Sequence, residues 1–228
     1  MASVAIITAR GGSKRIPRKN VKQFMGKPMV CYAIEAAIKS NLFDEVMVST
    51  DDAEIAEIAK LAGASAPFMR SDATANDFAT TRDVLQEVLS EYRQRGKVFD
   101  WFACIYPCVP FLTADIISEA YAAFCKSDAE ALMPVVKFSF PIQRAVRISD
   151  KGLLEYREPE NAPKRSQDLE PTYHDVGMFY FYKTDAFLSA AKMSIVPYIM
   201  PEERIQDIDT VDDWKMAELK YKVLNGNV

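Results

Sequence analysis

The stretch "VAIITARGGSKRIPRKN", from Val4 to Asn20, decides the fold class. Its first six residues are a continuous run of apolar and β-branched side chains, which predicts a buried strand. Two glycines then end the strand. A glycine-rich turn after the first strand lies at the carboxyl edge of an α/β sheet, where such folds bind ligands. The cations gathered in this turn are Arg10, Lys14, Arg15, Arg18 and Lys19.

Farther along the chain, short apolar runs alternate with segments of helical period. This alternation implies βαβ units and therefore an α/β, Rossmann-like fold, with a mostly parallel sheet and helices on both faces. We expect a single domain over residues 1–228. The expected strands are 4–9, 45–50, 66–69, 100–107, 130–137, 177–183 and 194–200, and the expected helices are 29–40, 52–63, 80–95, 114–127, a short one after 183, and 211–224.

Residues 138–172 interrupt this rhythm. They are rich in prolines and charges and have no helical period. An excursion of this kind between two strands predicts a protruding arm, used for dimerisation or as a substrate lid.

The formal net charge of the chain is −4, which argues against a general nucleic-acid binder. The positive charge is instead local, because Met1 to Ile34 contains seven cations and no acidic residue. Neither a signal peptide nor an apolar run long enough to span a membrane is evident, and four cysteines without a pairing pattern fit a reducing compartment. We therefore expect a cytoplasmic protein with no membrane partner. Cys104 and Cys108 are a poor zinc motif, since the chain has one histidine and no second paired motif.

The basic turn is predicted to bind phosphate. Glycine lets backbone N–H groups face a phosphate, and the cations match its charge. The Walker and dinucleotide patterns both fail here, the second because Arg15 stands where the third glycine is required. Since Pro17 delays the next helix, the long loop is suited to a nucleoside triphosphate. The alternative interpretation is a solvated run of charge.

Asp207 and Asp209 form a candidate metal site late in the chain. Alternate residues of an extended segment point to the same side, so two carboxylates can meet one Mg²⁺. The alternative is a pair of turn and capping acids. Asp52 is predicted to cap the helix that follows it, and Asp51 to contact ribose or close the turn.

Several motifs resemble the cytidylyltransferases that activate nonulosonic acids, the CMP-sialic acid synthetase family. The motifs follow the family's order over nearly the whole chain: "ARGGSKRIPRKN" (9–20), "STDD" (49–52), "PFMRSDATANDFATT" (67–81), "RSQDLEPTYHD" (165–175) and "QDIDTVDDW" (206–214). The resemblance implies a nucleotidyltransferase fold, CTP as the nucleotide, a homodimer and Mg²⁺ held by Asp207 and Asp209. It also implies catalytic roles for Arg10, Lys14 and Lys19. The CTP-binding residues would be Arg10, Gly11, Gly12, Ser13, Lys14, Lys19, Asn20, Arg70 and Thr81.

The sugar side departs from the sialic acid pattern. Tyr106 and Leu112 replace a glutamine and an arginine, and "YHDVG" (173–177) lacks the expected Asn-Gly pair. These variants resemble the branch of the family that activates pseudaminic acid. The implied substrate-binding residues are Tyr106, Arg165, Gln167, Asp168, Tyr173, His174 and Asp175, although a lone histidine is often structural.

The expected reaction joins CTP to a nonulosonic acid and releases pyrophosphate. Rival interpretations are a related transferase that uses sialic acid, legionaminic acid, Kdo or a sugar phosphate, and a non-catalytic nucleotide-binding module of the same fold. A Rossmann dehydrogenase is disfavoured by the failed glycine pattern.

Overall fold

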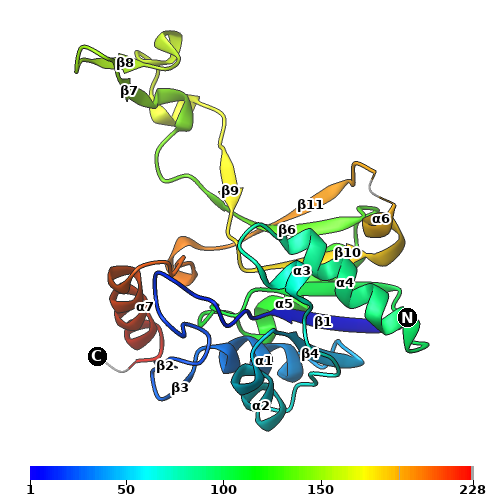
Figure 1. Cartoon of the computed structure of the whole chain (residues 1–228). Helices are drawn as coiled ribbons and strands as arrows, with labels where there is room; N and C mark the ends of the chain where they lie inside the picture. Colours follow the sequence, from blue (N-terminus) through cyan, green and yellow to red (C-terminus); the bar gives the residue numbers. More distant parts are fainter. Residues whose placement is uncertain (190, 227–228) are drawn as a thin grey trace.

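A seven-stranded sheet forms the centre of the computed structural model, which describes residues 1–189 and 191–226 (Figure 1). The strand order is β11-β6-β10-β5-β1-β4, and β9 also pairs with β6. The strands are β1 (Ser3–Thr8), β4 (Glu45–Ser49), β5 (Trp101–Ile105), β6 (Ala131–Lys137), β9 (Tyr173–Asp175), β10 (Phe179–Lys183) and β11 (Ile195–Ile199).

Five of the seven strands, β1, β4, β5, β6 and β11, run in the same direction, so the sheet is mostly parallel, as the sequence predicts. β1 runs parallel to both β4 and β5, and β11 runs parallel to β6. β10 lies antiparallel between β5 and β6, and the short β9 is antiparallel to β6. Val4, Ala5, Ile6 and Ile7 in β1 are fully buried, which explains the unbroken apolar run at this strand.

Helices cover both faces of the sheet, and this prediction is confirmed. Ile7 packs into a core with the helices α1 (Val30–Lys39), α2 (Ala53–Leu61) and α5 (Ala114–Cys125). Ile6 points to the opposite face and packs with α4 (Thr81–Gln94) and α6 (Thr184–Leu188). The alternation of neighbouring side chains in one strand thus builds two cores.

A third apolar cluster joins the start of the chain to its end. A short hairpin consists of β2 (Gln23–Phe24) and β3 (Lys27–Pro28). Its Phe24 packs edge to face on Trp214, with 5.4 Å between the ring centroids. Trp214 lies in α7 (Val211–Leu224), whose first turn is capped by Thr210. Because the basic loop leads into the hairpin and the acidic turn leads into α7, this contact brings the two segments together.

One predicted strand is wrong. Residues 66–69 form no strand, and a single bridge between Met47 and Ser65 is all that pairs there. Pro67 lacks an N–H group and cannot extend the pairing. A short helix, α3 (Asp72–Ala75), follows between the expected strand 66–69 and the expected helix 80–95, where the sequence predicts no element.

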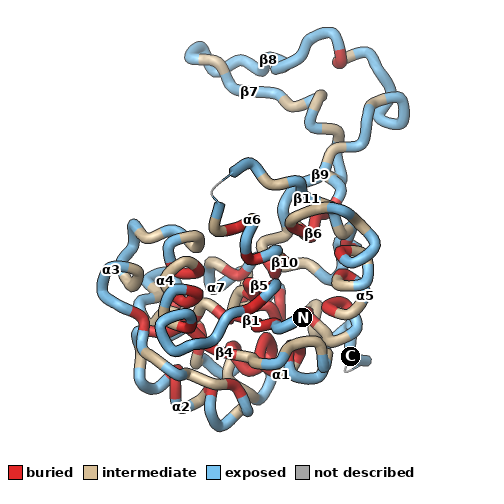
Figure 2. The backbone as a smooth tube through the Cα atoms, turned by 90° about the vertical axis from the view of Figure 1, so that its right-hand side faces the viewer, coloured by how far each residue is buried: buried red, intermediate tan, exposed pale blue. Residues whose placement is uncertain are grey.

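Residues 138–172 extend from the body as an arm (Figures 1 and 2). The arm contains an antiparallel hairpin, β7 (Val146–Ile148) with β8 (Leu154–Tyr156), and three single-turn 3₁₀ helices at 142–144, 159–161 and 166–168. A fourth 3₁₀ turn, 202–204, precedes the acidic segment. All six hairpin residues are exposed, so the arm has no core of its own around this hairpin.

Arg18 fastens the basic loop to α2. Its guanidinium donates hydrogen bonds to Asp52 and Glu54, and Asp52 caps the helix as predicted by accepting from the N–H groups of Glu54 and Ile55. Arg18 also has a positive φ of 56°, which turns the chain toward Lys19. It does not line the cleft described below, so one of the five cations of the loop serves the fold.

Replacing Arg18 by Met is expected to reduce stability at neutral pH and much less in acid. The hydrogen bond from Arg18 lowers the pKa of Asp52 below its usual value of about 4. A lowered carboxyl pKa stabilises the fold above the unfolded pKa, and this contribution disappears as the pH falls through the folded pKa. Urea unfolding at several pH values measures the difference. Arg93→Met on α4 is the matched control, because Arg93 is exposed and forms no ion pair within residues 1–189 and 191–226.

Candidate functional site

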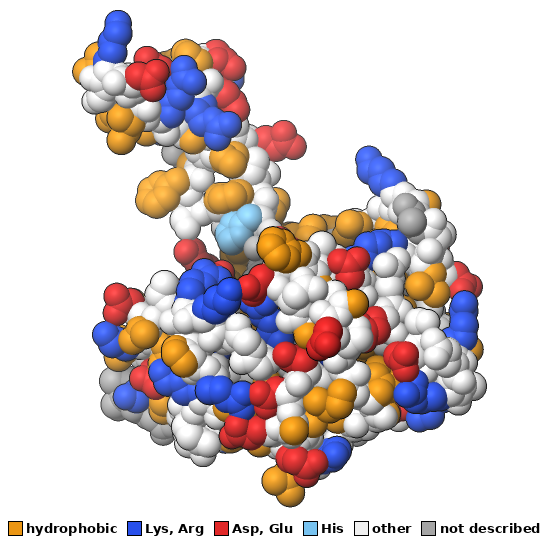
Figure 3. Space-filling view, in the orientation of Figure 1, with side chains coloured by type: hydrophobic (Ala, Val, Ile, Leu, Met, Phe, Trp, Pro, Cys, Tyr) orange, Lys and Arg blue, Asp and Glu red, His pale blue; other side chains and the backbone are white. Residues whose placement is uncertain are grey.

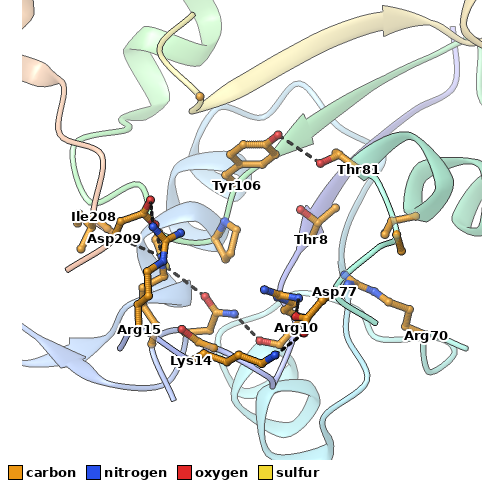
Figure 4. A pocket seen from close by; sticks show the side chains of 18 of the residues that line it. Thr8, Arg10, Lys14, Arg15, Arg70, Asp77, Thr81, Tyr106, Ile208 and Asp209 are labelled. Atoms are coloured by element: carbon orange, nitrogen blue, oxygen red, sulfur yellow. Dashed lines mark hydrogen bonds and ion pairs between the residues drawn. The ribbon is translucent and has the colours of Figure 1, made fainter. Parts of the chain in front are cut away.

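A cleft of about 610 Å³ opens at the carboxyl ends of β1 and β5 (Figure 4). This is the edge at which the sequence places a ligand. The cleft holds cations from the basic loop, hydroxyl groups from strand ends and α4, and carboxylates from two distant segments. Its lining residues include Thr8, Arg10, Ser13, Lys14, Arg15, Lys19, Asn20, Arg70, Asn76, Asp77, Thr81, Tyr106, Cys108, Asp207 and Asp209.

Four cations of the loop face two carboxylates across the cleft. Arg10 and Lys14 both donate to Asp77, at 2.8 and 2.5 Å. Arg15 lies 2.7 Å and Lys19 lies 3.6 Å from carboxylate oxygens of Asp209. The predicted ligands Arg10, Lys14 and Lys19 therefore lie in one cleft.

Gly11 is required by a close approach. A Cβ atom there would lie 2.7 Å from Oδ2 of Asp52, and the Gly11 N–H donates to Asp51 at 2.9 Å. Asp51 therefore closes the turn, which is one of its two predicted roles. Gly12 has open space around it, so a side chain would fit there. Ser13 lines the cleft and its N–H donates to the carbonyl of Gly11 at 3.0 Å.

Asn20 braces the loop from within. Its side-chain N–H donates to the carbonyl of Arg10 at 2.8 Å, and Cys108 donates its S–H to the Asn20 oxygen at 3.2 Å. Burial raises the pKa of Cys108 to about 12, so the thiol keeps its proton at neutral pH. Asn20 lines the cleft but is only 5% exposed, and its amide is engaged by the protein.

Arg70 and Thr81 lie on the other side of the cleft from Lys14 and Arg15 (Figure 4). Arg70 is buried and donates to the carbonyl of Ser49 at 2.6 Å. Burial lowers the pKa of its guanidinium, which nevertheless stays charged as arginine does in proteins. The Thr81 hydroxyl lies 3.3 Å from that of Tyr106. This side offers the fixed donors and acceptors that a nucleobase needs.

Asp207 and Asp209 both line the cleft, while Ile208 between them is 1% exposed and packs near Trp214. Lys19 Nζ donates to the Ile208 carbonyl at 2.7 Å, so the segment is held against the basic loop. Mg²⁺ needs one or two carboxylates and completes its shell with water and phosphate oxygens, and this pair fits that requirement.

Two absences hold for residues 1–189 and 191–226. No group of three or more His, Cys, Asp or Glu side chains is placed to hold a metal ion, Cys104 and Cys108 included. Nor does any helix combine the length and the apolar character needed to cross a bilayer. The metal prediction therefore depends on the Asp207–Asp209 pair and on phosphate oxygens.

A second hollow of about 590 Å³ adjoins the cleft at the root of the arm, and the two share Tyr106, Gly177 and Asp207. Asp175 lines this hollow and accepts hydrogen bonds from Tyr180 at 2.7 Å and from the Gly177 N–H at 2.8 Å. Burial raises the pKa of Tyr106, which keeps its hydroxyl protonated. The remaining polar lining residues include Lys137, Ser139, His174, Glu202, Gln206 and Lys220.

Four predicted substrate residues line neither hollow. Arg165 and Asp168 pair with each other at 2.8 Å on the exposed arm. Gln167 lines a small hollow at the root of the arm, and Tyr173 is 43% exposed on β9. Their role in substrate binding stays a prediction.

Sequence reasoning missed Asp77, Lys137 and Lys220 as lining residues. Lys137 ends a strand of the sheet, and this position at the ligand-binding edge was a usable signal. Asp77 lies in the quoted motif 67–81, which was a usable signal as well, whereas Lys220 had none, because only the folded chain brings it to the cavity.

The chain matches the family model described as "Cytidylyltransferase" over residues 4–195. It is 38% identical to the pseudaminic acid cytidylyltransferase of Campylobacter jejuni, over 98% of this chain and 97% of that one. It is 30% identical to the CMP-N,N'-diacetyllegionaminic acid synthase of Legionella pneumophila, over 96% of this chain and 95% of that one.

A solved structure has the same fold. CMP-2-keto-3-deoxy-manno-octonic acid synthetase, solved in complex with CTP, gives a TM-score of 0.72 at 19% identity over 99% of this chain and all of that one. The sheet and the basic cleft at its edge are consistent with the family that the two sequence comparisons indicate. The chain therefore belongs to the cytidylyltransferase family.

Proposed function

We propose that this enzyme transfers the cytidylyl group of CTP to a nonulosonic acid, and that pseudaminic acid is its substrate. The observation that carries the proposal is the junction of two hollows at Tyr106 and Asp207. One hollow has the charge for a triphosphate, and the other adjoins it where an acceptor sugar could lie.

The triphosphate of CTP would follow the basic loop. Arg10 and Lys14 hold the two phosphates that leave, and Lys19 lies beside the phosphate that stays. Arg70 and Thr81 receive the cytosine on the far side. Of the three residues Gly11, Gly12 and Ser13, Gly12 would offer its backbone N–H and Ser13 its hydroxyl, since the N–H groups of Gly11 and Ser13 bond within the protein, and Asn20 keeps the loop in shape.

In the proposed reaction, the anomeric hydroxyl of the sugar attacks the α-phosphorus in line. A new P–O bond forms to the sugar oxygen, whose proton passes to solvent water, while the bond from the α-phosphorus to the bridging oxygen breaks and pyrophosphate leaves with the negative charge. Arg10, Lys14 and Lys19 stabilise charge that grows during this step, because transfer to phosphorus depends on positioning and electrostatics. Mg²⁺ held by Asp207 and Asp209 would supply further neutralisation of the phosphate charge.

The acceptor sugar would occupy the second hollow. Its carboxylate would meet cationic groups, for which Lys137 and Lys220 are the candidates, and His174 lines the same hollow. Asp175 is held in place by Tyr180 and Gly177, so it can accept a hydrogen bond from a sugar hydroxyl or amide group. The relationship to the Campylobacter jejuni enzyme favours pseudaminic acid over other nonulosonic acids.

A substrate panel tests this proposal. Purified enzyme is given CTP and Mg²⁺ with pseudaminic, legionaminic, sialic or Kdo acid, and pyrophosphate release is followed. We expect the largest kcat/KM with pseudaminic acid and little release with ATP in place of CTP. A preference for another acid would overturn the sugar assignment, and no release with any acid would favour a non-catalytic nucleotide-binding module.

We also propose that the arm pairs two copies of the chain. Hydrophobic side chains lie exposed along it (Figure 3), among them Phe140, Ile148, Leu153 and Leu154. An isolated two-stranded hairpin is marginal in water, so a second copy that covers β7 and β8 would stabilise it. Such pairing would also bring Arg165, Gln167 and Asp168 of one copy close to the cleft of the other copy.

Leu154→Glu is expected to convert the dimer into monomers, because it places a charge in the apolar arm surface. Light scattering coupled to size-exclusion chromatography measures the mass. Leu61→Glu is the matched control, since Leu61 is 89% exposed on α2, away from the arm. A wild-type monomer, or a Leu154→Glu dimer, would contradict the proposal.

A further inference from the structure

Asp77 lies between two of the predicted phosphate ligands (Figure 4). Arg10 donates to its Oδ1 at 2.8 Å, and Lys14 donates to its Oδ2 at 2.5 Å. Each carboxylate oxygen therefore meets one cation, as two oxygens of a phosphate group would. The two cations cannot give the same hydrogen bonds to Asp77 and to a phosphate at one time.

Hydrogen-bonded turns on both sides of Asp77 hold its backbone in place. On one side, the Asn76 side chain accepts from the N–H groups of Phe78 and Ala79 at 2.8 and 3.0 Å. On the other side, Thr80 and Asp83 form the capping box that starts α4. Neither the Asn76 turn nor the capping box uses the carboxylate of Asp77. The carboxylate therefore stays near Arg10 and Lys14 when these two cations bind another anion.

The surroundings of Asp77 distinguish it from the predicted metal ligands. Asp207 and Asp209 are two residues apart in one segment, whereas Asp77 has no acidic neighbour among the cleft residues within five positions of it. The side chain of Lys14 is 79% exposed and that of Asp77 is 45% exposed. Exposed ion pairs are weak, so a triphosphate with several charges can displace Asp77.

We propose that Asp77 is a positioning residue that competes with phosphate groups for Arg10 and Lys14 and so promotes the release of pyrophosphate. This inference rests on the proposed function, in which these two cations hold the leaving phosphates. Asp77 is displaced when CTP binds. After the reaction it offers both cations a replacement partner, which weakens the hold of the site on pyrophosphate.

The test measures binding of inorganic pyrophosphate by calorimetry in EDTA, which removes any contribution from metal ligation. Asp77→Asn is expected to bind pyrophosphate roughly two- to thirtyfold more tightly than wild type, the range that corresponds to loss of the two exposed ion pairs with Arg10 and Lys14. Asp72→Asn is the matched control. It removes the same charge from α3 in the same segment, and Asp72 does not line the cleft.

A kinetic measurement with Mg²⁺ completes the test. Asp77→Asn is expected to show stronger product inhibition by pyrophosphate and an unchanged KM for the sugar acid, a pattern that simple loss of structure would not produce. Asp77→Ala should shift pyrophosphate binding in the same direction. Binding by Asp77→Asn that equals that of Asp72→Asn, or is weaker, overturns the inference. If wild type binds neither CTP nor pyrophosphate, the proposed function itself fails.

Discussion

Asp209→Asn is expected to lower kcat by roughly 10²- to 10³-fold and to leave the protein folded. The amide keeps the shape of the side chain but removes the charge that Mg²⁺ requires. Asp209 also lies 2.7 Å from Arg15 and 3.6 Å from Lys19, so its loss frees two cations for phosphate. CTP binding in EDTA should therefore be unchanged or tighter while turnover collapses.

A loss of turnover without a loss of CTP binding distinguishes a metal ligand from a residue that binds the nucleotide. Pyrophosphate release at several Mg²⁺ concentrations measures turnover, and calorimetry in EDTA measures CTP binding. Asp212→Asn is the matched control, because the Asp212 side chain is 90% exposed at the start of α7 and pairs with Lys215 at 3.1 Å. Magnesium-dependent activity close to that of wild type in Asp209→Asn would refute the metal assignment.

Local chemistry was sufficient to predict much of the fold and part of the site. The apolar run of β1 and the glycines after it place a ligand loop at the sheet edge without any knowledge of partners. Asp52 was identified as a helix cap from its neighbours alone. Such inferences succeed because each depends on residues a few positions apart.

Contacts between residues that are far apart in the sequence could not be predicted in the same way. Arg18 is one of five similar cations in the sequence, and only its contacts with Asp52 and Glu54 show that it fastens the loop to α2. Asp77 meets Arg10 across 67 positions of sequence, a pairing that no local pattern encodes. The antiparallel direction of β10 likewise follows from the path of the chain through the arm and not from the side chains of the strand.

Lys19→Met is expected to lower kcat roughly a hundredfold, with a smaller change in the KM for CTP. Lys19 lies where the basic loop meets the acidic segment, since its Nζ donates to the Ile208 carbonyl at 2.7 Å and lies 3.6 Å from Asp209. Its side chain is 20% exposed, so its charge is screened by water less than that of Lys14. A cation at this position acts most strongly on charge that develops at the reacting phosphorus.

Steady-state kinetics with varied CTP separate the two contributions. A loss confined to kcat shows that Lys19 acts in the transition state, whereas a rise in KM alone shows uniform binding of the nucleotide and contradicts the assigned role. Lys60→Met, on the exposed face of α2, is the matched control for the loss of one positive charge. Lys19→Arg should recover part of the rate, because it restores the charge but cannot keep the same single contact with the Ile208 carbonyl. Full activity in Lys19→Met would exclude this lysine from the reaction and leave the charge at the α-phosphate to Arg15, the other cation that contacts Asp209.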